Sequence, residues 1–349
     1  MGGAITRMAP VGLLSRALPE PFLSVCYHMV SDAPVAHVKH YQFLTTTEFE
    51  RDLRDLEGRF PYVCYEDMNN PSERGQGKRG RSTSMCLTFD DGFAECASVV
   101  RPILRNHRAS AIFFVITDLI DNQVAFLETK ASLCVDALSR LPADKVETIK
   151  RDLGLEARIS KADNAYREAV PAQMARQWSA FAPRLRPFLV WLLTISPGET
   201  PLLDRLCERL NIDAIAYVKD IKPYLSVEQI LQLRSDGFVI GAHSCSHRRL
   251  KDLTRRDAER EIVDSCRRIH ELTGQASVPF AFPYSGGGLD RTWLARLREA
   301  HPFIGLFFDT RGFQRDEPFV IQRVFGERIE ETGSIDHLLR RAWTRRLLS

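Results

Sequence analysis

The sequence has no long apolar segment and little excess charge of either sign. Its most apolar stretch, residues 188–195, is eight residues long, whereas a helix that crosses a bilayer needs about 20. Lysine and arginine together number 48 and aspartate and glutamate 45, which leaves a formal net charge of +3. We therefore expect no transmembrane segment, and so small a charge does not favour nucleic acid as a partner.

The cysteines also lack a pattern. Eight of them, at positions 26, 64, 86, 96, 134, 207, 245 and 266, form neither a CxxC motif nor a paired spacing, which is typical of reduced, buried thiols. Near the N-terminus, Pro10, Gly12, Arg16 and Pro19 interrupt a short apolar stretch before the core of a signal peptide can form. These features predict a cytoplasmic protein.

With 349 residues, of which 44% are hydrophobic and 27% charged, the chain has the composition of a globular protein. Predicted helices alternate with short apolar segments that are typical of buried strands. The predicted strands are residues 22–28, 85–90, 111–116, 238–242, 278–282, 303–308 and 319–325. This alternation predicts a parallel α/β barrel or a doubly wound sheet, with chemistry at the carboxyl ends of the strands.

Helix signals lie between these strands. Thr47 with Glu50 and Ser226 with Gln229 match the capping-box pattern, and Pro102 lies near a break in the predicted helix 93–107. Residues 254–272 and 289–300 also have helical spacing.

Residues 121–222 differ from the rest in being rich in alanine, leucine, arginine, glutamate and lysine, with helical spacing and no good strand. We interpret them as a helical insertion within a discontinuous barrel domain, residues 20–120 and 223–330, which a C-terminal helix, residues 331–349, follows. The insertion fits a lid or substrate-recognition unit as well as a stabilising cap or an oligomer surface. The oligomeric state stays open.

The strongest chemical signal is the segment 88–92, Thr-Phe-Asp-Asp-Gly, which ends a predicted strand. Two adjacent carboxylates, Asp90 and Asp91, repel each other unless a cation or a shared proton compensates them. A metal ion would relieve that repulsion. An Asp-Asp-Gly turn or a helix cap is the simpler alternative.

Two further segments follow predicted strands. His243 and His247 lie four residues apart after the strand 238–242, and two imidazoles with one carboxylate are typical ligands of a hydrolytic zinc ion. In the segment 280–288, Pro283 fixes the backbone and three glycines allow a ligand to approach closely. Alone this segment is a turn; beside the other two it can present the Tyr284 backbone N–H to a developing oxyanion.

These three motifs, in this order and each at a strand end, resemble those of the polysaccharide deacetylases of the NodB-homology type. The resemblance covers residues 20–120 and 223–325 and includes the opening Tyr27-His28 pair after an apolar strand. It implies an α/β fold, a distorted (β/α) barrel with fewer than eight complete repeats, which carries the helical insertion.

The resemblance also implies roles for individual residues. Asp90 would be the catalytic base. The metal ligands would be Asp91, His243 and His247, and the substrate-binding residues would be His28, Pro283 and Tyr284. The cofactor would be a divalent metal, with zinc favoured and cobalt, nickel, manganese and iron as alternatives. Asp90 would take a proton from water that the cation acidifies, and attack on an amide carbonyl would release acetate and an amine.

The sequence departs from the family pattern at three points, one of which is a loose match to the fourth motif around Asp309 and Thr310. Ala281 stands where the family often has an arginine that holds the base, which leaves Arg311 and Arg323 as alternative partners. The late histidine motif that supplies a general acid in many members is not recognisable, and His337 lies in the predicted C-terminal helix. Asp90 would then return the proton itself, or His28 would assist.

The leading functional hypothesis is removal of an N-acetyl group from an amino sugar in polysaccharide or lipid-linked glycan biosynthesis. The expected substrate is a small-molecule or lipid-linked amino sugar, such as a nucleotide-linked or lipid-linked precursor. Hydrolysis of another carbon–nitrogen bond, in a formamide or a cyclic imide, is the alternative on the same barrel. An inactive carbohydrate-binding protein is a third reading, which the four intact site residues disfavour.

Overall fold

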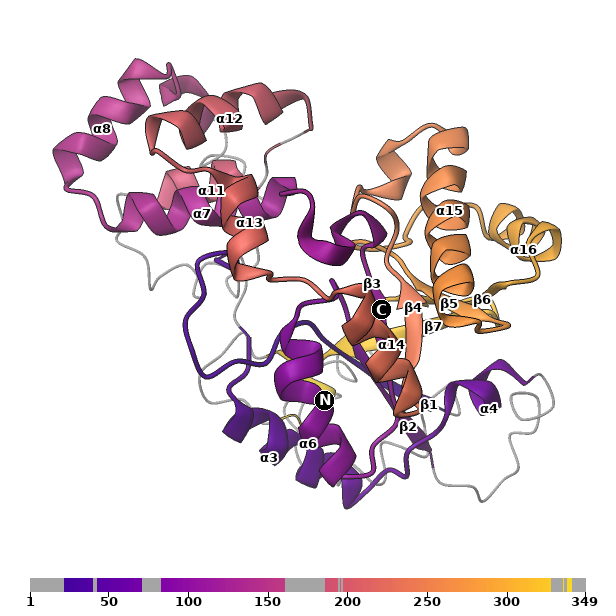
Figure 1. The fold of residues 1–349 in the computed structure, drawn as a ribbon. Coiled ribbons are helices and arrows are strands. Elements are labelled where there is room, and N and C mark those ends of the chain that lie inside the picture. Colours follow the sequence, from indigo (N-terminus) through magenta and orange to yellow (C-terminus); the bar gives the residue numbers. More distant parts are fainter. Residues whose placement is uncertain are drawn as a thin grey trace, which may run out of the picture.

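The computed structural model describes residues 22–39, 43–70, 83–160, 186–193, 195, 197–327, 335 and 338–340. Seven parallel strands close into a barrel in sequence order (Figure 1). They are β1 (Phe22–Tyr27), β2 (Ser84–Phe89), β3 (Ala111–Val115), β4 (Val239–Ala242), β5 (Val278–Ala281), β6 (Ile304–Asp309) and β7 (Val320–Phe325). The predicted distorted (β/α) barrel is confirmed, and each strand lies within one or two residues of its predicted position.

The strands are buried on both faces, as the apolar runs predict. Along β3, Ile112 and Phe114 belong to one apolar cluster, while Phe113 and Val115 belong to another that includes residues of the surrounding helices. A two-residue period with both faces apolar is the pattern of a parallel sheet covered by helices. The short helix α4 (Tyr65–Asn69) joins the first cluster, and the Tyr65 hydroxyl accepts a hydrogen bond from the Leu306 backbone N–H at 3.0 Å.

Helices cover the outside of the barrel. They are α3 (Thr46–Glu57), the π-helix η1 (Cys96–Val100) with α6 (Arg101–Asn106), α14 (Val227–Ser235), η4 (Leu250–Asp252), α15 (Arg255–Thr273) and α16 (Arg291–Ala300). The expected break near Pro102 is the change from η1 to α6, where proline occupies one of the first two positions of the new helix.

One capping box is confirmed and the other was wrong by two residues. Ser226 and Gln229 cap α14 reciprocally. The box of α3 uses Thr45 and Glu48 instead of Thr47 and Glu50, since both pairs share the same Thr-x-x-Glu spacing. The Asp32 carboxylate accepts a hydrogen bond from the Thr46 backbone N–H, and Thr45 keeps the extended backbone of a cap residue.

The described part of residues 121–222 contains helices and no strand. After β3 come the 3₁₀ helix η2 (Thr117–Asn122), α7 (Leu127–Ser139), α8 (Ala143–Asp152), α11 (Arg186–Leu193), η3 (Pro197–Glu199), α12 (Thr200–Arg209) and α13 (Ala214–Ile221). They gather on one side of the barrel (Figure 1), and α7, α8, α11 and α12 share an apolar cluster of their own, which includes Cys134, Trp191 and Leu203. The exact division into domains stays a prediction, and the expected C-terminal helix 331–349 lies mostly outside the described residues.

Within the described ranges, no helix is both long and apolar enough to cross a membrane.

Candidate active site

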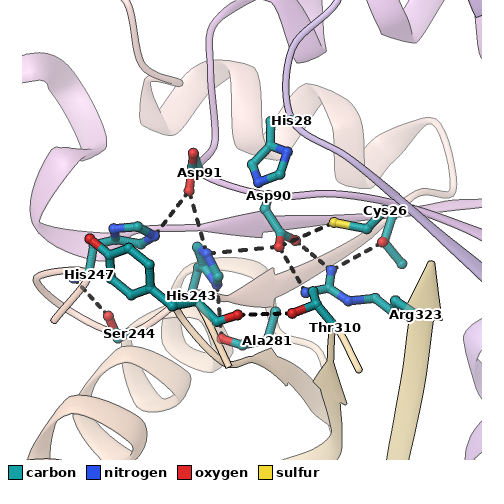
Figure 2. Close-up of polar contacts among 12 residues, drawn as sticks. Cys26, His28, Asp90, Asp91, His243, Ser244, His247, Ala281, Thr310 and Arg323 are labelled. Atoms are coloured by element: carbon teal, nitrogen blue, oxygen red, sulfur yellow. Dashed lines mark hydrogen bonds and ion pairs between the residues drawn. The ribbon is translucent and has the colours of Figure 1, made fainter. Parts of the chain in front are cut away.

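The polar residues that follow β2 and β4 meet Arg323 of β7 near the carboxyl ends of the barrel strands (Figure 2). Asp90 and Asp91 follow β2, and His243 follows β4. All three side chains are buried, with 3%, 6% and 2% exposure. Parallel strands deliver these groups to one end of the barrel, so residues more than 150 positions apart in the sequence lie in contact.

Asp91, His243 and His247 form a cluster with the geometry of a metal site. The Oδ1 atom of Asp91 lies 3.4 Å from Nε2 of His243 and 3.4 Å from Nε2 of His247. Ligands at the usual distance of about 2.0–2.1 Å from a tetrahedral zinc ion stand about 3.4 Å apart. One carboxylate oxygen and two imidazole nitrogens are also a donor set that suits a hydrolytic divalent metal, so these residues fit a metal ion.

The second nitrogen of each imidazole points away from this cluster and has an acceptor. Nδ1 of His243 lies 2.9 Å from the Ala281 carbonyl oxygen, and Nδ1 of His247 lies 3.3 Å from Oε1 of Glu128. Because a carbonyl and a carboxylate only accept hydrogen bonds, both Nδ1 atoms carry a proton, and the neutral form of each imidazole turns its Nε2 lone pair toward Asp91. This is the tautomer that a metal ligand requires.

Asp90 has a different partner, the fully buried guanidinium of Arg323 on β7. Two parallel hydrogen bonds of 2.6 and 2.8 Å join them, and Arg323 also donates to the Thr88 hydroxyl at 3.1 Å. Burial favours the neutral acid, but the charge of Arg323, the charge of His243 and the hydrogen bonds from Arg323 together outweigh burial and hold the pKa of Asp90 below its usual value. Asp90 is therefore ionised at neutral pH.

The backbone at Asp91 is left-handed, with φ of 69° at Asp91 and also 69° at Gly92. A Cβ atom at position 92 would lie 3.1 Å from a methyl group of Val115. Glycine therefore lets the turn pass against β3 and aim both carboxylates inward. Burial opposes ionisation of Asp91, yet a hydrogen bond from His243 and the charges of protonated His247 and His28 lower its pKa further than burial raises it.

His28 directly follows β1 and lies beside Asp90. Its Nδ1 lies 2.9 Å from Oε1 of Glu327, and its backbone N–H donates to the same oxygen. Burial favours neutral imidazole, but the Glu327 carboxylate outweighs it and raises the pKa of His28 to about 9. The side-chain donor atoms of His28, Asp90 and Cys26 all lie within 4.8 Å of one another, so a charged imidazole stands beside the carboxylate of Asp90.

The turn after β5 covers one edge of the site. Pro283 is buried, and Tyr284 has a left-handed φ of 61° with 42% of its surface exposed. The Thr310 hydroxyl donates to the Tyr284 carbonyl at 2.9 Å. Asp309, fully buried, accepts from Ser285, Gly286 and Thr310 and so fixes the glycine-rich turn.

A family model described as polysaccharide deacetylase matches residues 77–152 and 195–301, more than half of the chain. The chain belongs to the polysaccharide deacetylase family. Membership makes it a hydrolase that acts on carbon–nitrogen bonds other than peptide bonds, in a family whose substrates are carbohydrates.

Several solved structures are similar to the chain, and two of them are deacetylases with a TM-score above 0.5. The Streptococcus pyogenes deacetylase PplD in complex with acetate is 13% identical, with 93% of this chain and 98% of that chain covered and a TM-score of 0.53. BC0361, a polysaccharide deacetylase from Bacillus cereus, is 13% identical, with 93% and 69% covered and a TM-score of 0.51. Identities this low bear on the fold alone. No curated protein matches the chain by sequence.

The sequence-predicted residues of this polysaccharide deacetylase lie around one site, although their roles stay predictions. Of the two arginines considered as partners of the base, Arg323 contacts Asp90, whereas the Arg311 guanidinium lies 3.9 Å from Asp316. Ala281 contributes its carbonyl oxygen to His243. His337 lies outside the described residues.

Three residues of the deacetylase site escaped the sequence analysis. Glu327 had a signal, because it is a polar residue just after a predicted strand. Cys26, whose thiol lies 3.4 Å from Oδ2 of Asp90, lies within a predicted strand, where cysteine is an ordinary apolar residue. Burial raises its pKa well above the usual value, so the thiol stays protonated and donates to Asp90. Glu128 gave no signal, since an acidic residue in the first turn of a helix is ordinary.

Proposed function

We propose that this deacetylase removes the N-acetyl group from an amino sugar used in polysaccharide or lipid-linked glycan biosynthesis. The observation that carries the proposal is the division of labour between two adjacent carboxylates. Asp90 is paired with Arg323, whereas Asp91 faces two imidazoles through their Nε2 atoms. One carboxylate therefore stays ionised outside the cation site and can act as a base, while the other would complete that site.

Asp91, His243 and His247 would hold the divalent metal, which we take to be zinc, with cobalt, nickel, manganese and iron as alternatives. The bound ion supplies polarisation of the acyl carbonyl and acidification of water. The protein orients the two imidazole ligands in advance through the hydrogen bonds that their Nδ1–H groups donate.

Asp90 acts as the base in this proposal. It accepts one proton from the attacking water, whose oxygen forms a bond to the acyl carbon. Arg323 keeps Asp90 ionised before this step and orients both carboxylate oxygens. The backbone N–H of Tyr284 donates to the oxygen of the former carbonyl as its negative charge develops.

His28 supplies the proton for the leaving group. With a pKa of about 9, its imidazolium is the main form at neutral pH. It donates a proton to the amide nitrogen as the carbon–nitrogen bond breaks, which releases the amine and acetic acid. Asp90 then returns its proton to His28, from which it is separated by less than 4.8 Å. The histidine thus takes the role for which no late histidine motif was found.

The substrate contacts stay proposals. Beside His28 and Pro283, two aromatic rings lie near the site and remain 42% exposed, those of Tyr284 and Phe325. Exposed rings at a site offer flat apolar faces to a ligand, here a sugar ring. We propose a nucleotide-linked or lipid-linked amino sugar as the substrate. A cytoplasmic location is a further proposal, supported by the eight cysteines, all of which lie in the described ranges as free thiols.

The proposal is tested by incubating metal-loaded protein with N-acetylhexosamines that are nucleotide-linked, diphospholipid-linked or part of free oligosaccharides. We expect acetate and free amine in equal amounts from at least one class. His28→Gln should lose most of this activity, while His301→Gln, at the opposite end of the barrel after α16, should retain it. If the protein released only formate from N-formyl sugars, or opened only cyclic imides, that reaction would replace N-deacetylation as the proposed activity.

A further inference from the structure

Glu128 belongs to the first turn of α7, in the segment 121–222, yet its carboxylate reaches the candidate metal site. Its Oε1 atom lies 3.3 Å from Nδ1 of His247 and also accepts a hydrogen bond from the Tyr284 hydroxyl. Its side chain is 18% exposed. Two donors from two different loops thus converge on one carboxylate oxygen.

The chain around Glu128 is fastened to the barrel, so this contact is not that of a loose surface side chain. Asn122, which is buried, makes two hydrogen bonds with the backbone of Tyr224, at 2.7 and 2.9 Å, and thereby joins the two ends of the segment. The Thr129 hydroxyl lies 2.6 Å from the Tyr224 hydroxyl. The Phe126 ring packs edge-on against the His247 ring, with centroids 5.8 Å apart.

Tyr284 is held from a second direction. The guanidinium of Arg249 lies 4.0 Å from the centre of its ring, and the ring centres of Tyr284 and His247 are 4.9 Å apart. Desolvation, and after it the Glu128 carboxylate, keep the pKa of Tyr284 above its usual value. The phenol therefore stays protonated and donates to Glu128, which aligns the carboxylate with His247.

The balance of charges near the metal site explains why a carboxylate such as Glu128 would stabilise a bound ion. Two neutral imidazoles and one carboxylate leave a divalent ion with one positive charge in a buried site, and uncompensated buried charge is costly. The charge of Asp90 is taken up by Arg323. Glu128 is the neighbouring carboxylate that reaches the ligand set, through the Nδ1 proton of His247.

We propose that Glu128 is a positioning residue through which the segment 121–222 completes the metal site. It holds His247 with the proton on Nδ1 and the lone pair of Nε2 toward Asp91, and it raises the basicity of that ligand. The 121–222 segment is then part of the catalytic unit. This inference rests on the proposed function, because it takes Asp91, His243 and His247 as the metal ligands.

The test measures zinc affinity of the full-length protein by competition with a chromophoric chelator, without any substrate. Glu128→Gln keeps the size of the side chain but removes its charge, and we expect it to weaken zinc binding about 10- to 100-fold. Glu147→Gln, an exposed glutamate of α8 in the same segment, is the matched control and should bind like the wild type. Tyr284→Phe should weaken binding less than Glu128→Gln does.

A second readout follows the tautomer itself. Long-range ¹H–¹⁵N spectra should show His247 protonated at Nδ1 in the wild type and a mixture of tautomers in Glu128→Gln. A zinc affinity of Glu128→Gln within twofold of the wild type, with an unchanged tautomer, would overturn the inference alone. Wild-type protein that binds zinc no more tightly than His247→Ala would instead overturn the metal site and the proposed function.

Discussion

The pairing of Asp90 with Arg323 allows a prediction that needs no substrate. Replacing Arg323 with methionine keeps a long side chain but removes the guanidinium from a position with no exposed surface. Asp90 then stays buried without its two hydrogen bonds of 2.6 and 2.8 Å. Removing one partner of a buried ion pair costs about 3–5 kcal/mol, so we expect Arg323→Met to lower the free energy of unfolding by that amount at neutral pH.

The sign of the pH dependence follows from the direction of the pKa shift. In the wild type the folded-state pKa of Asp90 lies below its unfolded value of about 3.9. The stability from this pair is therefore complete above about pH 4 and is lost as the pH falls through the folded pKa. Without Arg323, burial raises the pKa of Asp90. Acidification then protonates Asp90 in the variant and removes the cost of its unpaired buried charge. The difference in the free energy of unfolding between Arg323→Met and the wild type should become smaller from pH 7.5 to pH 4.5.

Urea unfolding followed by circular dichroism measures both effects. The double variant Asp90→Asn with Arg323→Met removes both charges, and we expect it to recover at least about 2 kcal/mol of the loss, since no buried charge is left unpaired. If Arg323→Met alone does not fold, the recovery of folding in the double variant tests the same reasoning. A loss below about 1 kcal/mol in Arg323→Met that adds to the loss in Asp90→Asn would refute the reasoning.

Three further predictions concern other parts of the molecule. Glu327→Gln should lower the pKa of His28, about 9 in the wild type, by about one unit or more, and the alkaline limb of the pH profile of kcat should move with it. The wild-type pair adds stability that is complete below about pH 6.5 and is lost as the pH rises through 9, and the variant should lack this contribution. An NMR titration in which the pKa of His28 is unchanged would contradict the prediction. Gly92→Ala, at a φ of 69° with Val115 3.1 Å from the new Cβ, should cost roughly 1–3 kcal/mol in thermal unfolding; a Tm equal to that of the wild type would speak against a strained turn. Leu203→Ala, in the fully buried core of the 121–222 segment, should cost about 2–5 kcal/mol, read as faster hydrogen exchange in α12, and unchanged exchange there would mean that this core contributes little.

The barrel was predictable because each strand is a short apolar run that ends in polar residues. A parallel topology then brings all carboxyl ends together, so Asp90, Asp91, His243 and His247 were candidates for one cluster without any knowledge of distances. Each motif also lies within a few residues of its strand, where local sequence determines position.

What the sequence left open depends on contacts between distant segments. Arg311 follows β6 and Arg323 lies within β7. Only the barrel register, which pairs Arg323 with Ser24 of β1, decides which of the two arginines reaches Asp90. Glu128 looks like an ordinary acidic residue in the first turn of a helix. Its contact with His247 depends on how the segment 121–222 is fastened to the barrel.

The central claim is that the Asp91, His243 and His247 cluster holds one metal ion that deacetylation requires. The most direct measurement is metal content per chain by plasma mass spectrometry, with acetate release from N-acetylated amino sugars assayed on the same samples of wild type, His243→Ala and His301→Ala. The account predicts one metal per chain and acetate release in the wild type and His301→Ala, and the loss of both in His243→Ala. Metal content or acetate release that survives unchanged in His243→Ala would contradict it.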